Sequence, residues 1–144
     1  MSSRSQQMRR NKGRMMTDSF VRIPHHVINH EHFRSLSPRA TKLLIDLLAQ
    51  YRGYNNGDLC APLSLMRERG WNSSDQLQKA KNELIEKDVI IVTRQGGINK
   101  CSLYAVTWFP IDECKGKLDI ASTTTAPVNW RNKNASPSGG AEAS

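Results

Sequence analysis

The 144-residue sequence lacks the features that mark secreted, membrane-spanning and metal-binding proteins. Its three cysteines are odd in number and form no CxxC motif, which argues against a disulfide framework and favours a reducing compartment. Its uninterrupted apolar stretches are short, whereas a membrane-spanning helix needs roughly 20 apolar residues. The basic N-terminus is not followed by the apolar segment of a secretory signal. We therefore expect a cytoplasmic protein without a membrane anchor.

Acidic residues are missing from the N-terminal segment, so the charge is unevenly distributed. The chain has 21 basic and 13 acidic residues, a formal net charge of +8. Residues 1–16 contribute five basic side chains and no acidic ones, whereas residues 17–110 contribute twelve basic and nine acidic ones. The remaining residues hold four of each. The excess charge lies mainly on an N-terminal arm, where Arg9 and Arg10 are expected to contact the phosphates of a nucleic acid.

Composition and periodicity divide the chain into three parts. Residues 1–18 are polar, basic and aperiodic, which predicts a flexible basic arm. Residues 119–144 are rich in small and polar residues, and they are predicted to form a flexible tail. Residues 19–118 carry the periodic patterns, and about 100 residues suffice for one domain with a hydrophobic core.

The first long helix is predicted to begin at Ser37, with Pro38 in its first helical position. Apolar residues recur with the helical period from Ala40 to Leu48. The helix is expected to end near Tyr51, because the glycines and asparagines that follow permit a tight reversal.

Two further helices are predicted after a short extended segment at 58–61. Residues 63–69 are expected to form a short helix that ends at Gly70, a residue that favours the left-handed conformation after a helix. The next helix spans 73–87 and has a serine at its start. Its predicted buried stripe consists of Leu77, Ala80, Leu84 and Ile85.

A β-hairpin is predicted to follow these helices. Residues 89–94 are rich in β-branched side chains, residues 95–99 contain two glycines, and residues 102–108 form the returning strand. The whole order predicts an α+β fold of the winged helix-turn-helix type, in which a three-helix core carries a β-hairpin wing.

The helix at 73–87 is the candidate DNA-recognition helix. In helix-turn-helix proteins the corresponding helix lies in the major groove of duplex DNA and contacts the base edges. The hydroxyl, amide and ammonium groups suited to this role belong to Ser73, Ser74, Gln76, Lys79 and Asn82. Arg94 and Lys100 flank the predicted wing tip, where they would contact the sugar-phosphate backbone. A polar face is also what any amphipathic helix presents, and its acidic residues leave this helix nearly neutral.

The stretch from Leu36 to Trp108 resembles the winged helix-turn-helix of bacterial regulators such as the MarR and GntR groups. In it, SSDQLQKAKNELIEKDVIIVTRQGG stands where those families have the recognition helix, the next strand and the wing. The stretch FVRIPHHVINHEHFRSLSPRATKLLIDLLAQYRGYNNGDLCAPLSLM is similar to small helix-turn-helix proteins of proteobacterial plasmids and prophages. The resemblance implies that two groups of residues bind DNA, those of the recognition helix and those of the wing. They are Ser73, Ser74, Gln76, Lys79 and Asn82, and Arg94 and Lys100. The chain lacks the ligand domain and the long dimerisation helices of MarR and GntR regulators.

The other chemistry-bearing residues match no catalytic or metal-binding pattern. His26 and His30 have i, i+4 spacing, but no cysteine or carboxylate joins them at the spacing of a zinc finger or a metalloprotease. The glycines at 96–97 lack the lysine and hydroxyl residue of a phosphate-binding loop. We therefore expect a non-enzymatic protein that uses no metal or cofactor.

Trp130 stands alone in the predicted tail. A large apolar side chain in a polar segment is a candidate anchor for a protein partner. The alternative is that Trp130 folds back on its own domain.

The leading functional hypothesis is a double-stranded DNA-binding protein, with residues 73–87 in the major groove and the wing at 94–100 on the backbone. It would act as a transcriptional regulator, or as a replication or maintenance factor of a plasmid or prophage. A homodimer would form through residues 20–33 or 108–120. The alternative is a winged-helix module that engages host or phage machinery as an adaptor or inhibitor, with weak or no DNA binding.

Overall fold

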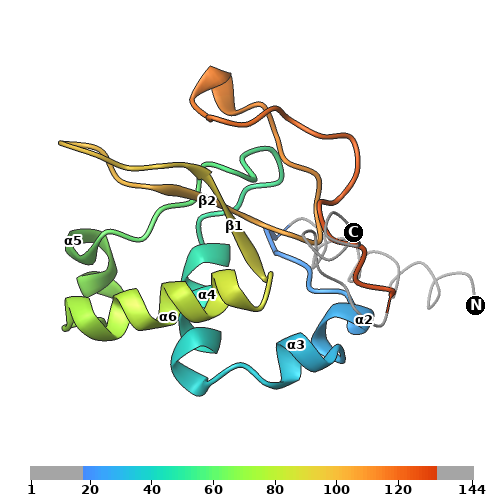
Figure 1. Ribbon diagram of the computed structural model, residues 1–144, viewed down its shortest axis with the longest axis horizontal. Coiled ribbons are helices and arrows are strands. Elements are labelled where there is room, and N and C mark those ends of the chain that lie inside the picture. The colour runs from blue at the N-terminus through green and yellow to red at the C-terminus, as the bar shows by residue number, and fades with distance from the viewer. Residues whose placement is uncertain (1–17, 133–144) are drawn as a thin grey trace, which may run out of the picture.

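The computed structural model describes residues 18–132, which form an α+β fold in which the helices precede a two-stranded hairpin (Figure 1). Arg9 and Arg10, like most of the predicted arm, lie outside the described residues. None of the described helices is long and apolar enough to cross a membrane. The elements are α2 His25–Ile28, α3 Glu31–Arg34, α4 Pro38–Leu48, α5 Leu63–Met66, the 3-10 turn η1 Arg67–Arg69, α6 Ser74–Glu86, β1 Ile90–Arg94, β2 Leu103–Val106 and the 3-10 turn η2 Cys114–Gly116.

Helix α4 begins as its sequence predicts. The Oγ atom of Ser37 accepts a hydrogen bond from the backbone N–H of Ala40 at 3.1 Å, and Pro38 occupies the first turn. The Ser37 cap is also tied to α6, because the carboxylate of Glu83 accepts hydrogen bonds from its backbone N–H at 2.6 Å and its hydroxyl at 2.7 Å. The long-range pair therefore fixes the start of α4 against the middle of α6.

The turn between η1 and α6 also follows the predicted pattern. Gly70 has a φ of +97°, in the left-handed region that favours glycine. The Oγ atom of Ser73 caps α6 by accepting a hydrogen bond from the N–H of Gln76 at 3.1 Å. Leu77, Ala80 and Leu84 of the predicted stripe are buried, as their helical spacing predicts, whereas its fourth member, Ile85, is half-buried.

The two strands of the hairpin are antiparallel, with Ile90 opposite Val106. Their register shifts between Val92 and Arg94, where the strands approach the tip. The predicted extended segment at 58–61 joins the hairpin through a bridge between Leu59 and Tyr104. Figure 1 shows the hairpin lying across α6, with its tip on the same side of the domain as α5 and the N-terminal end of α6.

The core extends beyond the predicted domain end at residue 118. Val128 and Trp130 are 2% and 3% exposed and belong to the same hydrophobic cluster as the buried residues of α4 and α6. The indole Nε1–H of Trp130 donates to the hydroxyl of Thr107 at 3.0 Å, and its ring meets that of His30 edge-on at 5.0 Å. The prediction of a flexible tail beginning at 119 is therefore wrong for its described part.

The sequence left two interpretations of Trp130 open. In the structure its side chain folds back on its own domain. Burial removes a large apolar area from water, and Thr107 satisfies the polar end of the indole. The predicted use of Trp130 as an exposed anchor for a protein partner is corrected accordingly, because the ring is enclosed in this fold.

Candidate nucleic-acid interface

The exposed face of α6 carries most of the polar side chains that the sequence selects. Ser74, Gln76, Lys79 and Asn82 are exposed, and Ser73 is half-buried because its hydroxyl caps the helix. The sequence reasoning missed two other polar side chains of α6, the exposed Gln78 and the half-buried Lys81.

Interactions within α6 pair several of the polar groups on this face, and one of them compensates the charge of Lys79. The Nζ atom of Lys79 lies 3.2 Å from a carboxylate oxygen of Asp75, one helical turn earlier. The side-chain amide of Gln78 donates to the Oδ1 atom of Asn82 at 3.1 Å. Both pairs are exposed to solvent, and salt also screens the ion pair, so a ligand can displace them at small cost.

A groove of about 520 Å³ lies where the N-terminal ends of α4 and α6 meet. From α4 it is lined by Arg39 and Lys42, and from α6 by Gln76. The guanidinium of Arg39 donates to the Oε1 atom of Gln76, so the two helices share one polar contact at this end. Sequence reasoning overlooked Arg39 and Lys42, because they belong to the helix that the pattern assigned to the core.

The turn that presents α6 is held by the buried carboxylate of Asp46, which is 3% exposed. Burial disfavours the charged form of Asp46, but three donors outweigh this effect and hold its pKa below the ordinary value. The donors are the Nζ atom of Lys42 at 2.8 Å, the Nε1 atom of Trp71 at 2.7 Å and the Nε atom of Arg69 at 3.0 Å. One carboxylate thus joins α4, η1 and the residue after Gly70.

The hairpin tip holds the two predicted wing residues in different environments. Lys100 is exposed, and its backbone pairs with that of Gly97 to close the tip. Arg94 is half-buried, and its guanidinium donates to the carbonyl of Cys101 at 2.9 Å. Ile98, between them, is 92% exposed. Only Lys100 therefore presents its full charge to solvent at the tip.

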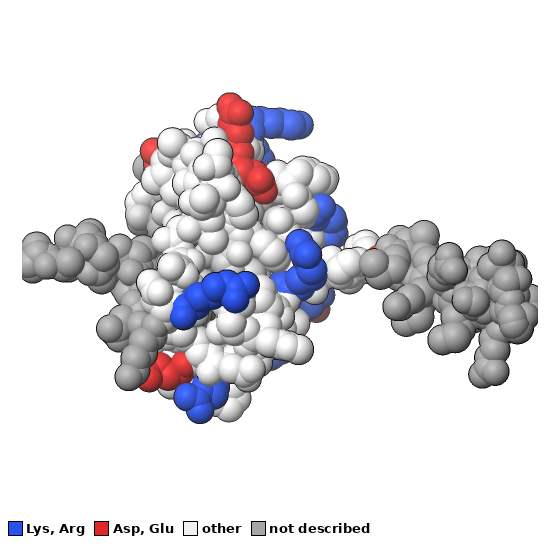
Figure 2. Space-filling model, turned by 90° about the vertical axis from the view of Figure 1, so that its right-hand side faces the viewer, with Lys and Arg blue, Asp and Glu red and all other residues white. Residues whose placement is uncertain are grey.

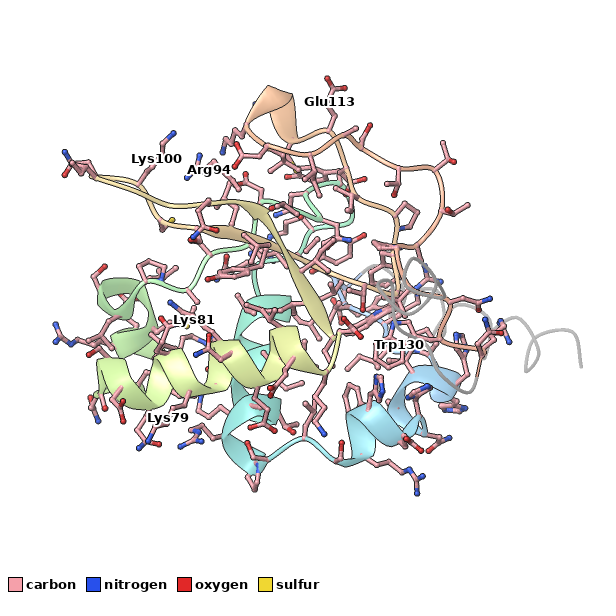
Figure 3. All side chains as sticks on the ribbon, viewed as in Figure 1. Lys79, Lys81, Arg94, Lys100, Glu113 and Trp130 are labelled. Atoms are coloured by element: carbon pink, nitrogen blue, oxygen red, sulfur yellow. The ribbon has the colours of Figure 1, made fainter. Side chains whose placement is uncertain are left out.

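The predicted cationic residues that lie within 18–132 do not form one continuous patch. Figure 3 shows Lys79 on the side of α6 that faces away from the hairpin, whereas Lys81 is directed toward it and Arg94 and Lys100 lie along it. Figure 2 views the side of the domain that carries α2, and there the basic side chains of the described chain are separated by uncharged surface. The positive charge on the described residues is therefore dispersed over the surface. At one end of the domain, the hairpin tip, α5 and the start of α6 lie on the same side.

A second hollow, of about 540 Å³, separates α6 from the hairpin. Lys81 lines it from α6, together with Gln78 and Asn82. The ammonium of Lys81 makes no hydrogen bond or ion pair with any residue in 18–132. Sequence reasoning passed over Lys81, because its position on the flank of α6 becomes informative only once the hairpin is folded over the helix.

The histidines lie apart from this surface. His30 is the N-cap of α3, and its Nδ1 atom accepts a hydrogen bond from the N–H of His32 at 3.0 Å. Within residues 18–132, no cluster of three or more His, Cys, Asp or Glu residues is arranged to hold a metal ion.

Comparison with protein-family models, with curated proteins and with solved structures finds no significant match to this chain.

Proposed function

We propose that the protein binds double-stranded DNA as a winged helix-turn-helix, with α6 in the major groove and the β1–β2 hairpin as the wing. The observation that carries the proposal is the turn between η1 and α6. Its geometry is fixed by the buried hydrogen bond between Trp71 and Asp46, while the outer face of α6 stays polar and exposed. A helix held at its N-terminus with exposed amide and hydroxyl groups suits base-edge recognition.

In this proposal, the groove at the start of α6 supplies part of the interface. Gln76 and Ser74 would contact base edges, while Arg39 and Lys42, which line the groove beside Gln76, would contact phosphates. Lys100 reaches the backbone from the wing. The basic residues of the N-terminal arm add affinity that does not depend on sequence.

The biological role that fits this reading is transcriptional control, or replication or maintenance of a plasmid or prophage. The basis for the role is the resemblance of the sequence to helix-turn-helix proteins of such elements. A homodimer would bind a two-fold symmetric site, so a palindromic consensus among selected duplexes would support both DNA recognition and dimerisation.

The direct test is fluorescence anisotropy with a labelled pool of random-sequence duplexes at several salt concentrations. If about six phosphates are neutralised, the log–log slope of affinity against salt should be about −5. Lys79→Glu should weaken binding roughly tenfold. Arg34→Glu is the matched control, because Arg34 is exposed on α3 and the change in net charge is the same. An absence of salt dependence, or equal loss in both variants, would contradict the proposal.

The second candidate is a protein-interaction module, and the acidic content of the α6 face favours it. Asp75 and Glu86 outnumber Lys79 on the exposed turns of the helix, which weakens attraction to a polyanion. If purified protein shows no duplex binding at low salt, while α6 substitutions abolish capture of one defined protein partner, this candidate replaces the first.

A further inference from the structure

The hollow between α6 and the hairpin has the size and the mixed lining of a small-molecule site. Its volume of about 540 Å³ falls within the range of ligand pockets, roughly 300–1,000 Å³. Residues from three segments line it, so it exists only in the folded domain. The lining comes from the segment before α5, from α6 and from the two strands of the hairpin.

Lys81 is the one charged residue in that lining, and none of the lining residues is acidic. Burial lowers the pKa of Lys81, because part of its hydration shell is lost. The nearby thiol of Cys60 supplies no counter-charge, since burial raises its pKa to about 11 and keeps it protonated near neutral pH. The ammonium therefore stands in the hollow without an anionic partner among the described residues.

The other side chains divide the hollow into a polar and an apolar part. Gln78, Asn82 and Gln95 supply amide groups that can donate hydrogen bonds near Lys81. Ile85, one helical turn after Lys81 on α6, and Val92 of β1 are half-buried and contribute apolar surface. A ligand with one anionic end and an apolar body would cover both parts.

We propose that this hollow is a binding site for a small organic anion, a carboxylate, sulfonate or phosphate monoester on an apolar body, with Lys81 as its charge partner. A bare inorganic anion would pair with Lys81 and leave the apolar wall in contact with water, so the organic part carries much of the affinity. Anion binding in this hollow does not require that the protein binds DNA. If α6 and the hairpin also contact DNA, an anion bound between them changes how the two elements fit the duplex.

The test uses the anionic fluorophore 8-anilinonaphthalene-1-sulfonate as a probe of the full-length protein. Wild-type protein should bind it with enhanced fluorescence, and Lys81→Met should weaken binding roughly tenfold, because a charge-assisted contact is lost. Lys79→Met is the matched control on the opposite side of α6, and its affinity should stay within about twofold of wild type. Circular dichroism verifies that each variant is folded.

A second variant tests the apolar wall without touching the charge. Val92→Trp fills the hollow from β1 and should abolish probe binding while Lys81 remains in place. The proposal is overturned if Lys81→Met and Lys79→Met bind the probe equally, or if Val92→Trp still binds it. It is also overturned if inorganic phosphate displaces the probe as effectively as benzoate. These titrations contain no DNA, so a failure of DNA binding leaves their result unaffected.

Discussion

The indole Nε1–H of Trp71 donates to the Oδ2 atom of Asp46 at 2.7 Å, and both side chains are buried. The pair joins the last turn of α4 to the residue that follows the left-handed Gly70. Because Lys42 and Arg69 donate to the same carboxylate, the charge is compensated where water is excluded. The orientation of α6 relative to α4 therefore depends on this contact.

Removing either partner should destabilise the domain. Asp46→Asn and Trp71→Phe are each expected to lower the free energy of unfolding by about 1–3 kcal/mol, because a buried group loses its hydrogen-bond partner. Urea denaturation followed by tryptophan fluorescence and circular dichroism measures the effect. Asp75→Asn, at an exposed ion pair, is the control and should cost less than about 0.5 kcal/mol. If the double variant loses the sum of the single losses, the two residues are not coupled.

Stability should fall in acid through two carboxylates. Burial opposes the charged forms of Asp46 and Glu83, but hydrogen bonds outweigh it and hold both pKa values below the ordinary 3.8 and 4.5. The unfolded chain then takes up protons first as the pH falls. The stabilisation is complete above about pH 5 and is lost as the pH falls through the folded-state pKa values. Urea midpoints between pH 7 and 3 should show a flatter acid limb for the Asp46→Asn, Glu83→Gln variant than for wild type.

The C-terminal segment should be required for folding. Trp130→Ala is expected to cost about 3–5 kcal/mol, because it leaves a large cavity beside His30 and Thr107. Tyr54→Ala is the control, since that aromatic ring is 72% exposed. A chain that ends at residue 118 should melt far below one that ends at 132, which keeps the described contacts. Equal melting temperatures would show that the burial of Trp130 contributes nothing to stability.

Local signals in the sequence predict the elements well. A serine before a proline marks the start of α4, a glycine marks the end of η1, and the spacing of Leu77, Ala80 and Leu84 marks the buried face of α6. These signals act over one or two helical turns, so they can be read without the tertiary structure. The predicted α+β order, helices followed by a hairpin, is confirmed for the same reason.

Contacts between distant segments are not predictable from such signals. The sequence pattern gives no sign of the role of Asp46, because that role depends on Trp71, 25 residues away along the chain. Trp130 lies in a segment without period, and its burial depends on a pocket assembled from α3 and the residues after β2. The groove and the hollow beside α6 likewise require the fold, because each combines residues from separate elements.

Asn56 should be as sensitive as a core residue, although its sequence context is that of a turn. Its side chain is fully buried, and its amide donates to the carbonyls of Val106 at 3.0 Å and Pro110 at 3.0 Å while its Oδ1 accepts from the N–H of Val106 at 2.9 Å. Asn56→Ala should cost about 2–4 kcal/mol, because backbone groups of and after β2 are left without partners. Asn55→Ala is the control, because Asn55 is the half-buried neighbour of Asn56, and it should lower the free energy of unfolding by less. Thermal unfolding of the two variants provides the measurement, and equal losses of stability would contradict the prediction.

The weak charge of α6 leads to a prediction on DNA affinity. Asp75 lies on the exposed face of the helix and pairs with Lys79 at 3.2 Å, so it both repels a phosphate and occupies the nearest cation. Asp75→Asn should remove both effects. Affinity for duplex DNA is therefore expected to rise about twofold to fivefold at low salt, and the gain should shrink as salt screens the interaction.

Glu31→Gln separates a local effect of Asp75 from one of net charge, because Glu31 is exposed on α3 and the charge changes equally. Anisotropy titrations of both variants at several salt concentrations provide the measurement. A gain confined to Asp75→Asn places the duplex against α6. An equal gain in both variants would mean that DNA responds only to total charge, which argues against α6 as the recognition helix. A gain in neither would favour the protein-interaction candidate, because α6 would then lie away from any bound duplex.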